Sequence, residues 1–163
     1  MNNLVEIERK FLVDMDLLTG PRGCGANTNG TPIEQGYIGQ HRSFWTTRVR
    51  VARHKAYLTV KGPKIGNSGF EAEYEIPVSD AKALLAQACE KTIKKIRYNI
   101  PHEGHVWELD IFEGENEGLA VVEIELMHSS DDYDIPEWCT KDVTGETKYY
   151  NSNLIDEPYQ DWP

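Results

Sequence analysis

Charged residues recur at every second position in almost every apolar segment of this sequence, and this alternation limits its fold more strongly than any other feature. Near the N-terminus, Glu6, Glu8 and Lys10 alternate with Val5 and Ile7. Successive side chains of a β-strand point to opposite faces, so the pattern predicts a strand with one charged face. The question is whether such a face meets bulk solvent or lies inside the protein.

Segments of this kind predict eight β-strands, most of them separated by short turns rich in Gly, Pro and His. The predicted strands are 4–12, 33–39, 44–53, 55–62, 70–77, 94–100, 105–113 and 119–127. A helix is expected between the fifth and sixth strands, over residues 79–91 with Ser79 or Asp80 as its N-cap, and a C-terminal helix over 145–155. Eight consecutive strands with few helices predict a mainly β (α+β) fold, an antiparallel barrel.

The composition predicts one globular domain over residues 1–163, with a poorly ordered tail at 156–163. No apolar run is long enough to cross a membrane. Three cysteines without C-x-x-C spacing (Cys24, Cys89 and Cys139), together with the lack of a signal-peptide pattern, favour reduced thiols in the cytoplasm. The net charge of −10 argues against general binding to nucleic acids, which attract basic proteins.

Seven of the eight predicted strands carry paired or clustered charges on a single face. Together these faces hold nine carboxylates (Glu6, Glu8, Glu71, Glu73, Glu75, Glu108, Asp110, Glu123 and Glu125) and six cations (Lys10, Arg48, Arg50, Lys61, Lys95 and Arg97). One interpretation is a solvated sheet face with cross-strand ion pairs, worth about 0.2–1 kcal/mol each. Two features oppose it: two helices are too few to cover the apolar face, and the like charges of Glu71, Glu73 and Glu75 repel one another.

The second interpretation is a closed barrel with its charges turned inward. An unpaired buried ion costs several kcal/mol, and a domain is stable by only about 5–15 kcal/mol, so such charges cannot fill a dry core. The interior is therefore expected to be a water-filled tunnel, in which metal ions and an anionic ligand complete the charge balance. An eight-stranded barrel is wide enough for one small ligand, and its apolar faces would pack outward against helices, loops and a second subunit.

The order of the motifs resembles the CYTH proteins, the triphosphate tunnel metalloenzymes, along almost the whole chain. The resemblance starts with E-x-E-x-K at Glu6–Lys10 and continues through QGYI (35–38), TRVRV (47–51), LTVKG (58–62), EYEIP (73–77), KIRYNI (95–100), WELDIFEG (107–114), VVEIEL (121–126) and GETKYYNSNL (145–154). It implies an eight-stranded antiparallel tunnel with a polar, charged lumen. Such a tunnel would bind tripolyphosphate, or a nucleoside or thiamine triphosphate, with Mg²⁺ or Mn²⁺.

The resemblance also implies roles for individual residues. The metal ligands would be Glu6, Glu8, Glu123 and Glu125, with Glu73, Glu75, Glu108 and Asp110 as further ligands or as groups that orient waters and basic side chains. The substrate phosphates would be bound by Lys10, Arg48, Arg50, Lys61, Lys95 and Arg97, while Lys148 closes one tunnel mouth. Lys10 and Tyr37 would act together near the reacting phosphate, and Lys95 would donate to the leaving group.

The function predicted in this way is hydrolysis of tripolyphosphate to pyrophosphate and phosphate by water. A class IV adenylyl cyclase is the main alternative, because it uses the same apparatus with the ribose 3′-hydroxyl of ATP as nucleophile. Thiamine triphosphatase activity and a polyphosphate-binding module without turnover are further alternatives, and the inward charge argues against a lipocalin-like carrier. The expected partner is a small triphosphate rather than a membrane or nucleic acid, and the resemblance implies that a homodimer is common.

Overall fold

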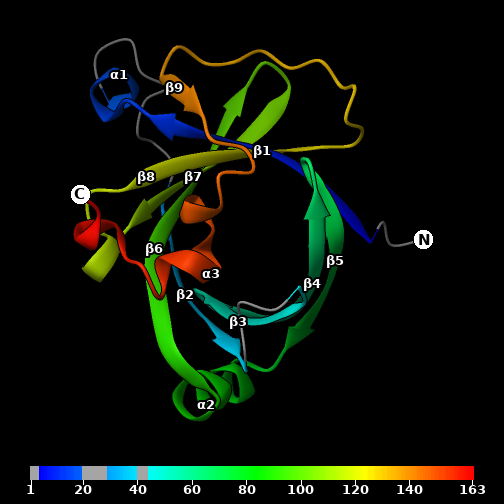
Figure 1. The fold of residues 1–163 in the computed structure, drawn as a ribbon, viewed down its shortest axis with the longest axis vertical. Helices are drawn as coiled ribbons and strands as arrows, with labels where there is room; N and C mark the ends of the chain where they lie inside the picture. Colours follow the sequence, from blue (N-terminus) through cyan, green and yellow to red (C-terminus); the bar gives the residue numbers. More distant parts are fainter. Residues whose placement is uncertain (1–3, 20–28, 40–43) are drawn as a thin grey trace.

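The strands close into a barrel in this computed structural model, which describes residues 4–19, 29–39 and 44–163 (Figure 1). Neighbouring strands pair antiparallel in the order β5-β4-β3-β2-β6-β7-β8-β1, and β1 also pairs with β5, which closes the ring. Among the described residues the ring consists of β1 (Val5–Val13), β2 (Thr31–Ile38), β3 (Thr46–Ala52), β4 (Lys55–Ile65), β5 (Ser68–Ile76), β6 (Cys89–His102), β7 (His105–Phe112) and β8 (Ala120–Leu126). The prediction of an eight-stranded antiparallel barrel is confirmed.

Short helices and one extra strand complete the fold. The described residues contain α1 (Met15–Thr19), α2 (Val78–Gln87), α3 (Asn151–Leu154), the 3-10 turns η1 (Gly114–Asn116), η2 (Thr147–Tyr149) and η3 (Tyr159–Asp161), and the strand β9 (Cys139–Asp142), which extends the sheet along β1. None of these helices has the length and apolar character needed to span a membrane. Cys24 lies outside the described residues.

The helix between the fifth and sixth strands is confirmed, but its predicted ends are wrong. The N-cap is Pro77 rather than Ser79 or Asp80, because the carbonyl oxygen of Pro77 accepts the backbone N–H groups of Asp80 (3.1 Å) and Ala81 (3.0 Å). At the other end, α2 stops at Gln87 because Cys89 already pairs with Ile38 of β2. Strand pairing therefore overrides the helical pattern that continues in the sequence.

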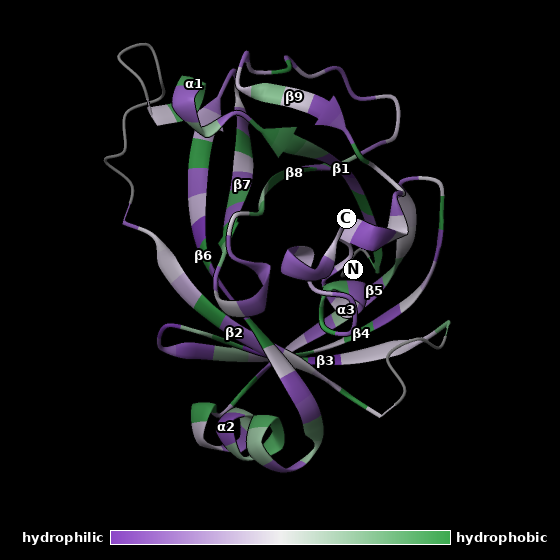
Figure 2. Cartoon of the chain, turned by 60° about the vertical axis from the view of Figure 1, so that its left-hand side comes forward, coloured by the Kyte–Doolittle hydropathy of each residue, from purple (hydrophilic) through white to green (hydrophobic). Residues whose placement is uncertain are grey.

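The apolar faces of the strands point out of the barrel, as the inward arrangement of charge requires. On one side, Val49 packs beneath Ala81 and Leu85 of α2. On another, Ile124 and Trp107 are fully buried in a core that is covered from outside by α1 and by Trp138 in the segment before β9. Hydrophilic and hydrophobic bands alternate along β6 and β7 in Figure 2, which displays the same two-residue period.

One end of the barrel interior is apolar. There the inward-facing side chains of the strands meet the segment 143–155, here called the C-terminal plug; they are Tyr37, Ile93, Phe112 and Val121. The plug contributes Val143, Tyr149, Leu154 and Ile155 to this core, and α3 lies within the ring of strands (Figure 1). The inner surface is thus divided into an ionic part and an apolar part, and the apolar part fixes the plug inside the barrel.

The tail that follows the plug is packed against it. Sequence composition favours poor order over 156–163, whereas the structure forms η3 there and buries Pro158. The ring of Trp162 contacts those of Tyr149 and Tyr159, with ring centroids 5.3 and 5.2 Å apart. Aromatic contacts of this geometry stabilise the folded chain beyond simple burial, which accounts for the position of the tail.

Candidate functional site

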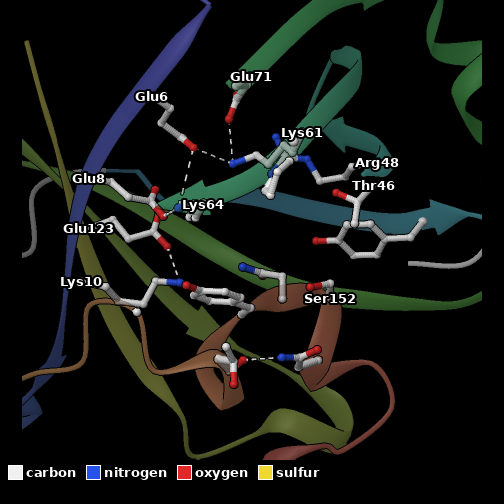
Figure 3. Close-up of a pocket in the computed structure, with 18 of the residues that line it drawn as sticks. Glu6, Glu8, Lys10, Thr46, Arg48, Lys61, Lys64, Glu71, Glu123 and Ser152 are labelled. Atoms are coloured by element: carbon white, nitrogen blue, oxygen red, sulfur yellow. Dashed lines mark hydrogen bonds and ion pairs between the residues drawn. The ribbon is translucent and has the colours of Figure 1, made fainter. Parts of the chain in front are cut away.

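The barrel encloses a cavity of about 1020 Å³ that is lined mainly by charged side chains (Figure 3). Most of the predicted site residues line it: Glu6, Glu8, Lys10, Tyr37, Arg48, Arg50, Lys61, Glu73, Lys95, Arg97, Glu108, Glu123, Glu125 and Lys148. Asp110 lies behind the lining and is fully buried. Glu75 does not line the cavity; its exposed side chain is 3.7 Å from Lys55.

Carboxylates gather on three adjacent strands, and we call Glu6, Glu8, Glu108, Glu123 and Glu125 the acidic wall. Strand register produces this grouping, because Glu8 of β1 lies directly opposite Glu125 of β8, and Glu108 of β7 lies opposite Glu123. Like charges at directly opposed positions of a sheet repel one another. The acidic wall therefore holds more negative charge than a purely structural role would favour.

The protonation behaviour of the acidic wall reflects this crowding. Burial, followed by the charges of Glu123 and Glu6, raises the pKa of Glu8. Burial and the neighbouring carboxylates Glu6 and Glu108 likewise raise the pKa of Glu125. By contrast, burial alone would favour neutral Glu123, but the cationic groups around it, led by Lys10, hold its pKa well below the usual value.

Lysines approach the acidic wall from two sides. Lys61 Nζ lies 2.8 Å from a Glu6 oxygen, and Lys10 Nζ lies 2.8 Å from a Glu123 oxygen. Lys64 forms an ion pair with Glu8, on the same side of the cavity as Lys61 (Figure 3). Because these acids are turned toward different lysines, no three carboxylates of the described residues converge on one point at metal-ligand spacing. The donor set itself, carboxylate oxygens in excess of nearby cations, suits a hard divalent cation.

Lys64 is a site residue that the sequence pattern did not reveal. The predicted strand ends at residue 62, and continued alternation from Lys61 would turn residue 64 outward. The pairing of β4 with β5 instead shifts register between Lys61 and Lys64, so both lysines face the cavity. An extra residue in one strand re-aims the side chains that follow it, and no local motif in the sequence announces such a bulge here.

Cations gather on β3 and β6, the two strands that flank β2, and we call Arg48, Arg50, Lys95 and Arg97 the basic wall. Arg50 Nε donates to Gln35 Oε1 at 3.0 Å, and no carboxylate of the described residues lies within ion-pair distance of this guanidinium. Burial, with Arg48 and Arg97 nearby, lowers the pKa of Arg50 to about 10. The basic wall is thus short of negative charge at its centre.

Arg48 also has too few partners within the described chain, in its case hydrogen-bond acceptors. Its Nη2 donates to Thr59 Oγ1 and to a Glu73 oxygen, both at 3.2 Å. Its buried Nε, however, has no hydrogen-bond acceptor among the residues that the structure describes. Buried donors in proteins are nearly always satisfied, and an unsatisfied one costs about 1–3 kcal/mol. An anion in the cavity would supply acceptors to this wall.

Asp110 fixes the other half of the basic wall. It accepts Lys95 Nζ at 2.5 Å and is held by Arg97 through Nε and Nη2, both at 2.7 Å. Burial would favour neutral Asp110, but Lys95 and Arg97 lower its pKa. Burial, together with Arg97 and Arg50, lowers the pKa of Lys95 to about 7 in spite of Asp110. Asp110 therefore orients two cations rather than lining the cavity itself.

The C-terminal plug contributes polar groups that the sequence did not indicate. Asn151 Oδ1 accepts Lys95 Nζ at 3.2 Å, and the carbonyl oxygen of Tyr149 accepts Lys10 Nζ at 3.3 Å. The ring of Tyr150 lies 5.5 Å from Lys10 Nζ and 5.7 Å from Lys64 Nζ. The plug therefore contacts Lys10, Lys64 and Lys95 from the end of the cavity that it fills. These contacts join residues far apart in the chain, so no local sequence pattern reveals them.

Comparison with known proteins places these features in context. The CYTH domain family model matches residues 4–156. An inorganic triphosphatase of Acetivibrio thermocellus is 44% identical over 158 residues, which cover 96% of this chain and 97% of that protein. An inorganic triphosphatase of Nitrosomonas europaea is 30% identical over 155 residues, 93% of this chain and 97% of that protein. The crystal structure of an inorganic triphosphatase superposes with a TM-score of 0.63 at 29% identity, covering 92% of this chain and 93% of that one.

Proposed function

The chain belongs to the CYTH domain family, and from this membership we propose that it is a divalent-metal-dependent inorganic triphosphatase. The reaction is attack of water on a terminal phosphorus of tripolyphosphate, with release of phosphate and pyrophosphate. One observation carries the proposal: an acidic wall and a basic wall line one cavity, and within the described residues neither Glu125 nor Arg50 has an oppositely charged side chain at ion-pair distance. A triphosphate with divalent cations supplies both kinds of charge at once.

The acidic wall is the proposed metal site. Glu6, Glu8, Glu123 and Glu125 supply the carboxylate oxygens that Mg²⁺ and Mn²⁺ prefer. When bound, such an ion neutralises phosphate charge and lowers the pKa of a bound water. The raised pKa of Glu125 fits this role, because bringing a cation to these carboxylates favours their ionised form.

The basic wall and the nearby lysines are the proposed phosphate site. Arg48 and Arg50 present guanidinium groups to the cavity, and a guanidinium can grip two phosphate oxygens at once. Lys95 is proposed as the donor to the leaving phosphate, since a pKa of about 7 lets it release a proton near neutral pH. Lys10 and Tyr37, which both line the cavity, are proposed to act beside the reacting phosphate.

The alternatives differ in what enters the cavity and what attacks it. A class IV adenylyl cyclase would use the same two walls with ATP, and a thiamine triphosphatase would accept an organic triphosphate. Inorganic triphosphatase is preferred because relatives at 44% and 30% identity carry that name. A module that only binds polyphosphate would need the basic wall alone, so the acidic wall speaks for turnover.

The test is incubation of the protein with tripolyphosphate, ATP or thiamine triphosphate in Mg²⁺ or Mn²⁺, with phosphate, pyrophosphate and cyclic AMP measured as products. We expect tripolyphosphate to be the best substrate and a chelator to abolish the activity. Cyclic AMP as the main product would replace the proposal with the cyclase. Tripolyphosphate binding without any product would leave the binding module.

The proposed setting follows from the same features. The cysteines of the described residues, Cys89 and Cys139, form no disulfide, which agrees with a cytoplasmic protein. The net charge of −10 agrees with a small-molecule partner rather than nucleic acid or a membrane. A homodimer is also proposed, and light scattering during gel filtration would measure the mass in solution.

A further inference from the structure

The last residues of the chain follow the family match, which ends at residue 156, and they fold back onto the plug. The backbone N–H of Tyr159 donates to the side-chain oxygen of Asn116 at 2.8 Å, and Asn116 is itself buried against the plug. The indole Nε1 of Trp162 donates to the carbonyl oxygen of Glu157 at 3.0 Å. These bonds hold the tail in one place at the side of the plug.

The tail brings Trp162 to a lysine of the cavity. The Nζ atom of Lys148 lies 4.8 Å from the centre of the Trp162 ring and 4.9 Å from that of Tyr149. Cations within about 6 Å of an aromatic ring centre are attracted to the ring. The two rings also contact each other at 73°. Lys148 is therefore held between two aromatic side chains that are themselves fixed.

The aromatic contacts leave the charge of Lys148 available. In the described part of the chain, no carboxylate lies within ion-pair distance of its ammonium group, although Lys148 lines the cavity. This differs from Lys10 and Lys61, which are paired with Glu123 and Glu6. A lysine oriented by rings instead of carboxylates keeps its full charge for an incoming anion.

We propose that Trp162 is a positioning residue that holds Lys148 at the edge of the cavity for a phosphate group of the substrate. A free lysine side chain loses rotational freedom when it binds, and restricting it beforehand removes part of that cost. Trp162 contacts Lys148 but does not itself line the cavity, so it acts on binding rather than on the chemical step. This inference rests on the proposed triphosphatase function for the identity of the anion.

The experiment compares Trp162→Ala with the conservative Trp162→Phe and with Gln160→Ala as a matched exposed change in the same turn. The dissociation constant of tripolyphosphate is measured by calorimetry, and KM and kcat by phosphate release. For Trp162→Ala we expect a KM and a dissociation constant raised about two- to fivefold, with kcat little changed, as befits one cation–π contact. Trp162→Phe and Gln160→Ala should stay close to the unaltered protein.

A second background separates positioning from general damage. In Lys148→Met the proposed phosphate-binding lysine is absent, so adding Trp162→Ala should weaken tripolyphosphate binding no further. Losses that simply add in the double variant, or an unchanged dissociation constant in Trp162→Ala, would overturn the proposal. If tripolyphosphate binds with the expected coupling but is not hydrolysed, the proposed function fails and the positioning role stands. If tripolyphosphate is hydrolysed but Trp162 and Lys148 show no coupling, the proposed function stands and the positioning role fails.

Discussion

The acidic wall and the basic wall are built from similar numbers of like charges, but they are balanced in different ways. Lysines that extend across the cavity pair with the acidic wall, as Lys61 does with Glu6 and Lys64 with Glu8. The basic wall is balanced mainly by Asp110 from behind, with Glu73 beside Arg48 and Glu108 beside Arg97, which leaves Arg50 at its centre without a carboxylate partner among the described residues. The acids can thus exchange flexible partners for a metal ion, whereas the arginines offer a fixed surface to an anion.

The two walls nevertheless share one electrostatic property. The pKa of Glu125 is raised and that of Arg50 is lowered, so at one position in each wall the surroundings disfavour the charged form. Burial heads the causes in each case, and like-charged neighbours add to it. A ligand of opposite sign relieves this unfavourable charge. We therefore expect divalent cations to stabilise the acidic wall and anions to stabilise the basic wall.

The largest effect is expected from Glu8→Gln in the acidic wall. The change keeps the shape of the side chain but removes a carboxylate that the proposed metal needs, so activity should fall by more than about 100-fold. Phosphate release from tripolyphosphate and Mn²⁺ binding by calorimetry would measure the loss. Glu75→Gln is the matched control, because Glu75 lies outside the cavity. Equal activity in the two variants would remove Glu8 from the metal site.

Arg50→Ala removes the central cation of the basic wall. We expect it to lower activity less than Glu8→Gln does and to leave stability intact. Loss of a charged hydrogen bond to phosphate, about 1.5–3 kcal/mol, corresponds to a fall of about 10- to 150-fold in kcat/KM. Removing a cation that has no carboxylate of the described residues within ion-pair distance should leave the free energy of unfolding unchanged or raise it in phosphate-free buffer.

The control for Arg50→Ala is Arg53→Ala, which alters an exposed arginine bonded to a backbone carbonyl outside the cavity. Kinetics with tripolyphosphate and urea unfolding would be measured on both variants. A marked loss of stability in Arg50→Ala would show that Arg50 is mainly structural and would contradict the contrast between the walls.

The sequence predicted the inward direction of the charged faces better than the apolar plug that fills one end of the barrel. Alternation at Glu6, Glu8 and Lys10 is a local property, and it correctly placed these side chains inside because the two-residue period of a strand is strict. The plug depends on contacts between Leu154 and residues such as Ile93, far apart in the chain. No local pattern distinguishes an apolar residue that fills one end of a barrel from one that covers its outside.

Other features escaped prediction because pairing with a neighbour decides them. The bulge between Lys61 and Lys64 turns a second lysine of β4 toward the acidic wall. Cys89 ends α2 because it pairs with β2. Asp110 was expected either to be a further metal ligand or to orient basic side chains, and its ion pair with Lys95 corresponds to the second of these roles. Alternation indicates the face that a residue of a regular strand occupies, whereas only the assembled ring decides where bulges fall and which residues meet.

The smallest effect is expected from Glu125→Gln, and it depends on pH. Glu125 of β8 lies directly opposite Glu8 on the neighbouring strand β1. Glu125→Gln removes this repulsion and should raise the melting temperature by about 1–3 °C in metal-free buffer at pH 7. Because the folded pKa of Glu125 is raised above its usual value of 4.5, the folded state binds more protons than the unfolded state in the window just above 4.5. The free energy of unfolding therefore falls as pH rises through that window, and the penalty is complete above it.

Thermal unfolding between pH 4.5 and pH 8 would test this sign, with Glu75→Gln as the exposed control. The advantage of Glu125→Gln should shrink as the pH approaches 4.5, where the carboxyl of the unaltered protein is increasingly neutral. Adding Mg²⁺ at pH 7 should reverse the order, because the unaltered acidic wall binds the ion more tightly and gains more stability from it. An advantage that persists at pH 4.5, or that survives saturating Mg²⁺, would mean that repulsion within the acidic wall is not what distinguishes it from the basic wall.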